Sequence, residues 1–132
     1  MVTLTRNSRD YVDVDFGFTK HPDSHNLTIK KNINAVKQAV INLLLLREGD
    51  KPFHPEIKSP LFDSLFELNT AVEKIIIEDE VRKYINTYEP RVYVQSVSVS
   101  FDNQNSLSCT VVGQIINLQE PFEVNILVER LR

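Results

Sequence analysis

Apolar residues recur at steps of three and four through the first half of the chain and at steps of two through its last third. Residues 31–47 carry an apolar stripe with the helical spacing, so the sequence predicts the first long helix there. Gly49 is a natural stop just after the last predicted turn. The stripe consists of Ile29, Ile33, Val36, Val40, Leu43 and Leu44.

A short helix is predicted over residues 61–68. Ser59 suits the position before a helix because its hydroxyl can accept a hydrogen bond from a free amide, and Pro60 suits the first helical position. The apolar residues of this segment should face a core; they are Leu61, Phe62, Leu65 and Phe66.

A third helix is predicted from Thr70 to about Tyr88. Thr70 and Glu73 have the spacing of a capping box, in which a hydroxyl and a carboxylate satisfy free amides at the helix start. Pro90 ends the helix because the residue before a proline is pushed out of the helical region. The buried side is expected to hold Val72, Ile76, Val81, Tyr84, Ile85 and Tyr88.

Three strands with short polar links follow residue 91 and predict an antiparallel meander. Gly113 is expected to mark a bulge or a close approach of two backbones. The alternating apolar positions are Tyr93, Val97, Val99, Phe101, Leu107, Cys109, Val111, Ile115, Phe122, Val124, Ile126 and Val128.

The fold class is therefore α+β, with two main helices and a short helix packed on one face of an antiparallel sheet of three to four strands. Residues 11–16, with the sequence YVDVDF, alternate as a short edge strand or extended arm. We expect a single domain over residues 1–132, made of an N-terminal arm (1–16), a helical half (17–90) and a β-meander (91–132).

Composition narrows the class of protein. The chain has 132 residues, of which 42% are hydrophobic and 25% charged, which is typical of one soluble domain. A net charge of -3 gives no basic field for phosphates, so no nucleic-acid partner is expected. The longest apolar run is too short to cross a bilayer, and residues 1–10 do not resemble a signal peptide, so no membrane partner is expected.

No enzyme, metal or cofactor is expected. His21 and His25 are four residues apart, but Pro22 between them prevents a clean helical turn and no further ligands complete a site. Pairs of acids such as Asp13 with Asp15, or Glu56 with Asp63, could be proposed for a glycosidase. No carboxylate is marked out by an apolar setting, and Cys109 alternates with core residues as a small apolar side chain.

The segment Glu89-Pro90-Arg91 lies where the third helix leads into the first strand of the meander. In an extended conformation after the helix, Glu89 and Arg91 would point to the same side and could act together. An arginine can hold a carboxylate with two parallel hydrogen bonds. On this segment alone, a helix stop with two solvated charges is the simpler interpretation.

The chain as a whole resembles one family. The residues that carry the resemblance are YVDVDF at 11–16, REGDKPFHPE at 47–56, LFE at 65–67 and YEPR at 88–91, followed by the strand meander. This order is similar to the lysozyme-like baseplate wedge proteins of contractile phage tails, which are related to the sheath-initiating subunit of type VI secretion. The family usually has a glycine shortly after the proline-glutamate pair, whereas this chain has Ile57-Lys58-Ser59-Pro60.

The resemblance implies a structural subunit in the baseplate of the virion tail, assembled in the host cytoplasm in multiple copies around the tail tube. Glu89, Pro90 and Arg91 would bind the helical core bundle of the wedge, and Arg47 and Phe53 would be further partner-binding residues. The tail sheath protein would be the second partner, joined by addition of a strand to an open sheet edge. Either the last strand or the strand from Tyr93 could supply that edge.

Two other functions remain open from the sequence. One is a lysozyme-like peptidoglycan hydrolase, which needs a catalytic acid. The other is a small anti-adapter protein of the same fold family, which shields a stress sigma factor from proteolysis. We expect Arg91→Ala to leave the fold largely intact and to abolish incorporation into the wedge.

Overall fold

The computed structural model describes residues 11–66, 70–103, 105–116, 118 and 120–130. These residues form three helices and two antiparallel sheets. The elements in chain order are β1 (Val12–Val14), β2 (Ile29–Lys31), α1 (Asn32–Leu45), α2 (Pro60–Ser64), α3 (Ala71–Tyr88), β3 (Val92–Asn103), β4 (Ser106–Ile115) and β5 (Pro121–Glu129).

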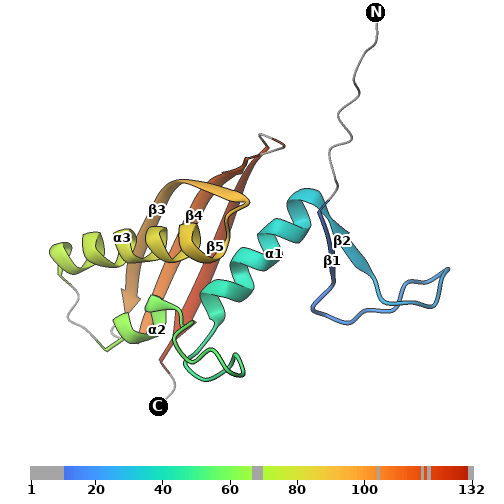
Figure 1. Ribbon diagram of the computed structural model, residues 1–132. Helices are drawn as coiled ribbons and strands as arrows, with labels where there is room; N and C mark the ends of the chain where they lie inside the picture. Colours follow the sequence, from blue (N-terminus) through green and yellow to red (C-terminus); the bar gives the residue numbers. More distant parts are fainter. Residues whose placement is uncertain (1–10, 67–69, 104, 117, 119, 131–132) are drawn as a thin grey trace, which may run out of the picture.

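The main sheet has the order β3-β4-β5, as expected for a meander, and all three helices lie on the same side of it (Figure 1). The helices cover only one face of the sheet because apolar and polar residues alternate along the strands. In β5, every second residue is buried under the helices and the others are exposed on the opposite face. The predicted α+β class is thus confirmed. The N-terminal arm pairs with β2 in a separate two-stranded sheet and does not become a fourth strand of the meander.

A β-bulge near the start of β3 shifts the alternation by one residue. The register with β4 slips between Val94 and Ser96, so Val92 and Val94 are buried before the bulge and Val97 and Val99 after it. Tyr93, predicted to face the core, is therefore 62% exposed.

Gly113 of β4 lies opposite this part of β3, where the two backbones come close. A Cβ at Gly113 would lie 3.0 Å from the carbonyl oxygen of Tyr93 and 3.1 Å from the ring of Phe122. The sequence prediction of a close backbone approach at this glycine is confirmed, and the bulge itself lies on the neighbouring strand.

The first two helices follow the predicted stripe with shorter bounds. Val36, Val40 and Leu44 of α1 are fully buried, while Ile29 belongs to β2 and is half exposed. Ser59 accepts a hydrogen bond from the amide of Leu61, as expected for an N-cap. α2 ends at Ser64, so Phe66 lies beyond it and is 70% exposed, against the prediction. Residues 67 and 68 of the predicted helix lie outside the described residues.

α3 begins at the predicted capping box, in which Thr70 and Glu73 each accept a hydrogen bond from the other's backbone amide. Three consecutive isoleucines made its phase ambiguous, because only Ile77 lies in step with Val81 and Ile85. Ile77 is buried. Three residues predicted to lie on the buried side of the helix are exposed instead, so those predictions are wrong; they are Val72, Ile76 and Tyr88.

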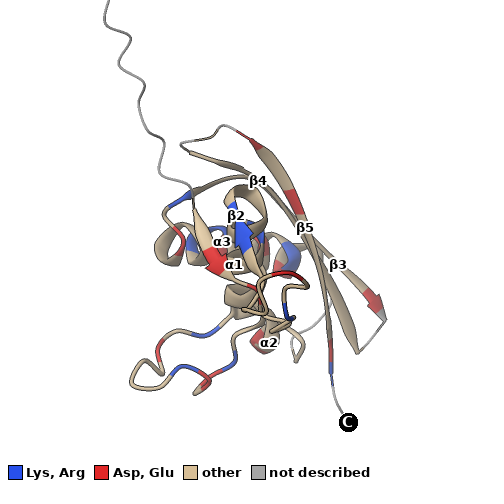
Figure 2. Cartoon of the chain, turned by 90° about the vertical axis from the view of Figure 1, so that its right-hand side faces the viewer, with Lys and Arg blue, Asp and Glu red and all other residues tan. Residues whose placement is uncertain are grey.

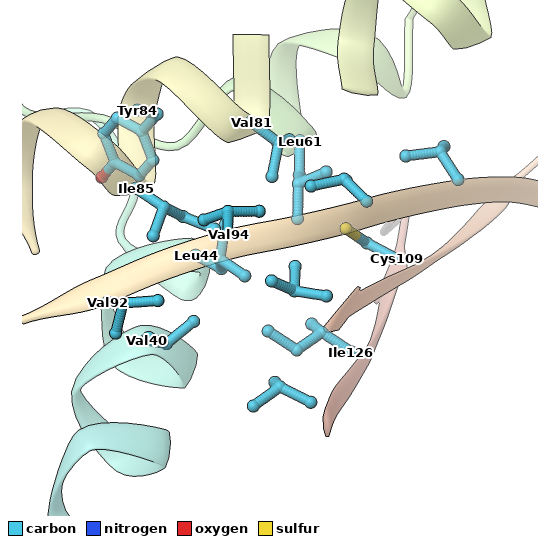
Figure 3. Packing of buried hydrophobic residues seen from close by; sticks show 14 of the residues in the cluster. Val40, Leu44, Leu61, Val81, Tyr84, Ile85, Val92, Val94, Cys109 and Ile126 are labelled. Carbon is cyan, nitrogen blue, oxygen red and sulfur yellow. The ribbon is translucent and has the colours of Figure 1, made fainter. Parts of the chain in front are cut away.

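The hydrophobic core forms where α1 and α3 cross the inner face of the sheet. Figure 3 shows Val40 and Leu44 of α1 and Val81 and Ile85 of α3 converging on side chains of the strands. Cys109 belongs to this core and is fully buried, as the sequence predicted, and burial raises the pKa of its thiol to about 12.

The β1–β2 hairpin lies beyond the start of α1 (Figure 1). Figure 2 shows acidic β1 beside basic β2, and the carboxylate of Asp15 pairs with the ammonium of Lys30 at 3.1 Å. Val12, Val14 and Ile29 point the other way and are exposed. The hairpin therefore presents its apolar face to the solvent.

Candidate functional site: the Glu89–Arg91 corner

The end of α3 and the start of β3 are joined by a tight turn. The amide of Glu89 donates to the carbonyl of Ile85 at 2.8 Å and so completes the last turn of the helix. The amide of Val92 then donates to the carbonyl of Glu89 at 3.2 Å, which closes a four-residue turn with Pro90 at its second position. Proline is favoured there because its ring fixes the φ that such turns need.

Within this turn Glu89 and Arg91 form a two-pronged ion pair. Nε of Arg91 donates to Oε1 of Glu89 at 2.6 Å, and Nη2 donates to Oε2 at 2.9 Å. The Glu89 side chain is only 9% exposed and that of Arg91 30%. The hydrogen bonds to Glu89 raise the pKa of Arg91 above its usual value. The two residues meet as expected, through a turn and not an extended segment, and the interpretation as two solvated charges is wrong for Glu89.

Tyr11 is a further member of this corner, although no pattern in the sequence predicts it. The Arg91 guanidinium carbon lies 5.2 Å from the centroid of the Tyr11 ring. The Tyr11 carbonyl accepts a hydrogen bond from the amide of Asn32 at 2.7 Å, and the Arg91 carbonyl accepts one from Ile116 at 3.0 Å. The corner thus joins the arm, α1, α3 and the end of β4.

Chemically, the corner is a rigid, partly exposed cation. A guanidinium has five N–H donors, and Glu89 engages two of them. The other three have no hydrogen-bond partner among the described residues and could reach carbonyl or carboxylate groups of a neighbour. Pro90 is exposed beside it and carries no donor of its own. The arrangement suits recognition of acceptors on another protein. The carboxylate of Glu89 is already paired with Arg91, and the charge of Asp13 acts on the same guanidinium from the arm.

Arg47 and Phe53 lie elsewhere. Tyr11 contacts the first residue of α1, whereas Arg47 lies two residues beyond its end, so the 14-residue helix separates the two places by about 21 Å. The Arg47 guanidinium stacks on the Phe62 ring at 4.9 Å. Phe53 is 97% exposed with a φ of +65°, so it does not anchor its loop in the core.

Other candidate chemistry is accounted for by local structure. Nδ1 of His21 accepts from the amides of Asp23 and Ser24, so this ring caps a turn. Within the described residues no three His, Cys, Asp or Glu side chains are grouped for a metal ion. Asp15 and Glu56 both have a lowered pKa, the first through Lys30 and the second through its own amide and His54. A catalytic acid needs a raised pKa.

The sequence profile of one family, described as baseplate wedge protein gp25, matches residues 30–119. This segment runs from β2 through β4 and contains all of Arg47, Phe53, Glu89, Pro90 and Arg91. The chain belongs to this family. Baseplate wedge protein gp25 of Enterobacteria phage T4 is 30% identical over 67 residues, which is 51% of each chain. The alignment thus spans about half the length of this curated relative.

Two solved structures share the fold of this wedge-family chain. A Geobacter sulfurreducens protein, crystallised under the provisional description of a tail lysozyme, gives a TM-score of 0.64 at 17% identity and covers 74% of this chain and 89% of its own. A chain in the baseplate of the anti-feeding prophage gives 0.63 at 16% identity, covering 93% and 88%. At these identities the likeness concerns the fold. Among the described helices, none has the length and apolar character needed to cross a membrane.

Proposed function

We propose that this baseplate wedge protein is a non-catalytic scaffold that binds neighbouring wedge proteins through the Glu89–Arg91 corner and starts the tail sheath by accepting a strand at the β5 edge. The observation that carries the proposal is the state of the strand edges. A strand edge accepts a partner only where its amides and carbonyls are unused.

The β1 edge is occupied by side chains of the same chain. The Val14 amide donates to the carboxylate of Asp13 at 2.8 Å, and the Val14 carbonyl accepts from Nε2 of Gln38 at 3.0 Å. These bonds occupy the groups that a new strand would need at the end of β1.

The β3 edge is closed in part by α3. The amide of Val99 points away from β4 and donates to the carboxylate of Glu78 at 3.1 Å. An added strand would have to displace this carboxylate and pass along the helix. The β3 edge is therefore a poor acceptor.

The β5 edge is open from Glu123 onward. Amides of Ile115 and Arg130 bond to carbonyls of Glu120 and Asn105, which places even-numbered residues of β5 in hydrogen-bonded pairs with β4. The amides and carbonyls of Glu123, Asn125 and Leu127 consequently point outward. Within the described part of the chain no backbone group bonds to them. These residues are exposed, so their side chains can also set the register of an added strand.

The corner and the loop supply the other contacts of the proposal. Arg91 offers its three remaining donors to carbonyls or carboxylates at the surface of the wedge bundle, in a position fixed by Glu89 and Tyr11. Phe53 is held in a left-handed backbone conformation with its ring in solvent, which costs energy and is typical of residues kept for binding. We assign it as an apolar contact to a wedge neighbour.

The test uses proline to remove one outward amide. Asn125→Pro should abolish binding of the purified sheath subunit of the same tail, because the central donor of the edge is lost while the bonds to β4 are kept. Asn125→Thr keeps the amide and serves as the matched control. Thermal unfolding checks that both variants fold. Undiminished sheath binding by a folded Asn125→Pro protein would contradict strand addition at β5.

A peptidoglycan assay tests the non-catalytic part of the proposal, since one structural neighbour carries a tail lysozyme description. No release of soluble fragments is expected from purified peptidoglycan. Release that is lost on mutating one carboxylate would establish an enzyme. Co-purification with a response-regulator adaptor, in place of wedge and sheath proteins, would favour the anti-adapter function.

A further inference from the structure

A hollow of about 350 Å³ lies between the end of α1, α2 and the end of β5. We call it the α2–β5 hollow. Its floor is apolar, with Phe62, Leu65 and Phe66, and Arg47 and Arg130 stand over this floor. The volume is at the lower end of the range for small-ligand sites, which begins at about 300 Å³.

The two arginines are held by aromatic rings. The guanidinium carbon of Arg47 lies 4.9 Å from the centroid of Phe62, and that of Arg130 lies 4.7 Å from the centroid of Phe66. Neither guanidinium has a carboxylate partner among the described residues. Stacking on a ring leaves the in-plane N–H donors accessible. Neither guanidinium donates a hydrogen bond to a described residue, so two positioned cations face one hollow.

The acids that line the hollow are engaged elsewhere. Glu48 and Asp63 both bind Lys58, at 3.6 and 3.1 Å, and these contacts raise the pKa of Lys58. Glu129 is exposed and follows the outward set of β5, so strand alternation directs its side chain to the face away from the helices. Glu48 and Asp63 share the one ammonium of Lys58, so the hollow as a whole carries no excess of positive charge. Within the described part of the chain, Arg47 and Arg130 are the cations of the lining that make no ion pair.

The position of the hollow suggests its occupant. Arg130 directly follows the last residue of β5, and its amide bonds to Asn105 at the end of the sheet. Because Glu129 and Arg130 line the hollow, a strand added along β5 that runs past Glu129 would pass beside it. The hollow is thus continuous with the edge assigned to the sheath strand.

We propose that the α2–β5 hollow binds the residues flanking the added strand, and that this flank combines a carboxylate, held by Arg47 and Arg130, with a large apolar side chain on the floor of Phe62, Leu65 and Phe66. The inference rests on strand addition at β5 and adds a reason why that edge would select one partner chain over another. The backbone ladder accepts almost any extended chain, whereas the hollow selects an acidic and apolar flank.

Binding of the sheath subunit tests the assignment. Arg47→Gln and Arg130→Gln should each weaken binding about tenfold, as expected for loss of one charge-assisted contact. Arg82→Gln makes the same change at an exposed position of α3 away from the hollow and should bind as wild type. If the wild type binds and both hollow variants match Arg82→Gln, the inference is overturned while strand addition stands. If the wild type does not bind the sheath subunit, the proposed function itself fails.

A small probe tests the hollow without any strand. Acetyl-Leu-Asp-Leu-amide added to the ¹⁵N-labelled full chain should shift the Nε–H resonances of Arg47 and Arg130. Acetyl-Leu-Asn-Leu-amide, which lacks the charge, should bind at least several-fold more weakly. Equal shifts with the two peptides, or none with the acidic one, would overturn the inference.

Discussion

The carboxylate of Glu78, on α3, accepts a hydrogen bond at 3.1 Å from the backbone amide of Val99, on the outer edge of β3. A side chain from the covering helix thus occupies a position that a neighbouring strand would otherwise use. The opposite edge of the same sheet has no such bond among the described residues. The two edges are therefore chemically different, and this difference can be tested.

Glu78→Ala should lower the free energy of unfolding by about 1 kcal/mol, because the amide of Val99 loses its partner. Urea unfolding measures the effect, and Glu80→Ala, at an exposed position of the same helix, is the control. Sheath binding should stay at the wild-type level if β5 is the acceptor edge. Tighter binding by the variant would instead point to β3.

Arg91→Ala should cost about 2 kcal/mol of stability, because it leaves the nearly buried carboxylate of Glu89 without its cation. The sequence suggested that this substitution would leave the fold largely intact, and a cost of this size is compatible with a protein that still folds. Arg91→Lys keeps the charge and cannot make both bonds, so it should fall between alanine and wild type in urea unfolding. Equal stability of all three proteins would contradict a structural role for the pair.

Gly113→Ala should destabilise the protein by about 1–3 kcal/mol, since the new methyl group would lie 3.0 Å from a backbone oxygen that cannot move freely. Thermal unfolding compared with Thr110→Ala, on the same strand, separates this clash from a general effect of alanine. A variant as stable as Thr110→Ala would mean that β3 and β4 can separate at the bulge without cost.

Acid should loosen the β1–β2 hairpin. The pKa of Asp15 is lowered, first by its bond to Lys30 and then by Thr19, so its contribution to stability is present above the ordinary value of 3.8 and is lost as the pH falls through the lowered pKa. Amide exchange at Thr28 should therefore rise below pH 3.8. Asp15→Asn should remove this pH dependence, and Asp23→Asn should retain it.

Local sequence signals predicted most of the elements. The capping box at Thr70 and the alternation in β4 and β5 were decisive because each depends on residues close together in the chain. Errors arose where two phases were possible. The bulge in β3 changed the side on which Tyr93 lies, and the run of isoleucines in α3 fitted a helix in more than one rotation.

The candidate site was predicted only in part, for a related reason. Glu89 and Arg91 are two residues apart, so a pattern could suggest that they meet. Tyr11 contacts Arg91 across 80 positions of sequence, and no local pattern contains that information. The separation of Arg47 from the corner likewise depends on the direction of α1 and not on any motif.

Pro121 gives the open edge of the sheet a fixed end. It is the first residue of β5 and pairs with Gln114 at a position whose amide would point away from β4, and a proline has no amide hydrogen to offer there. A neighbouring chain can thus gain donors only from Glu123 onward. At about 3.4 Å per residue, the stretch up to Glu129 is close to 20 Å long. Under the proposed strand addition, a stretch this short with a fixed first donor would hold each added chain at the same position along β5.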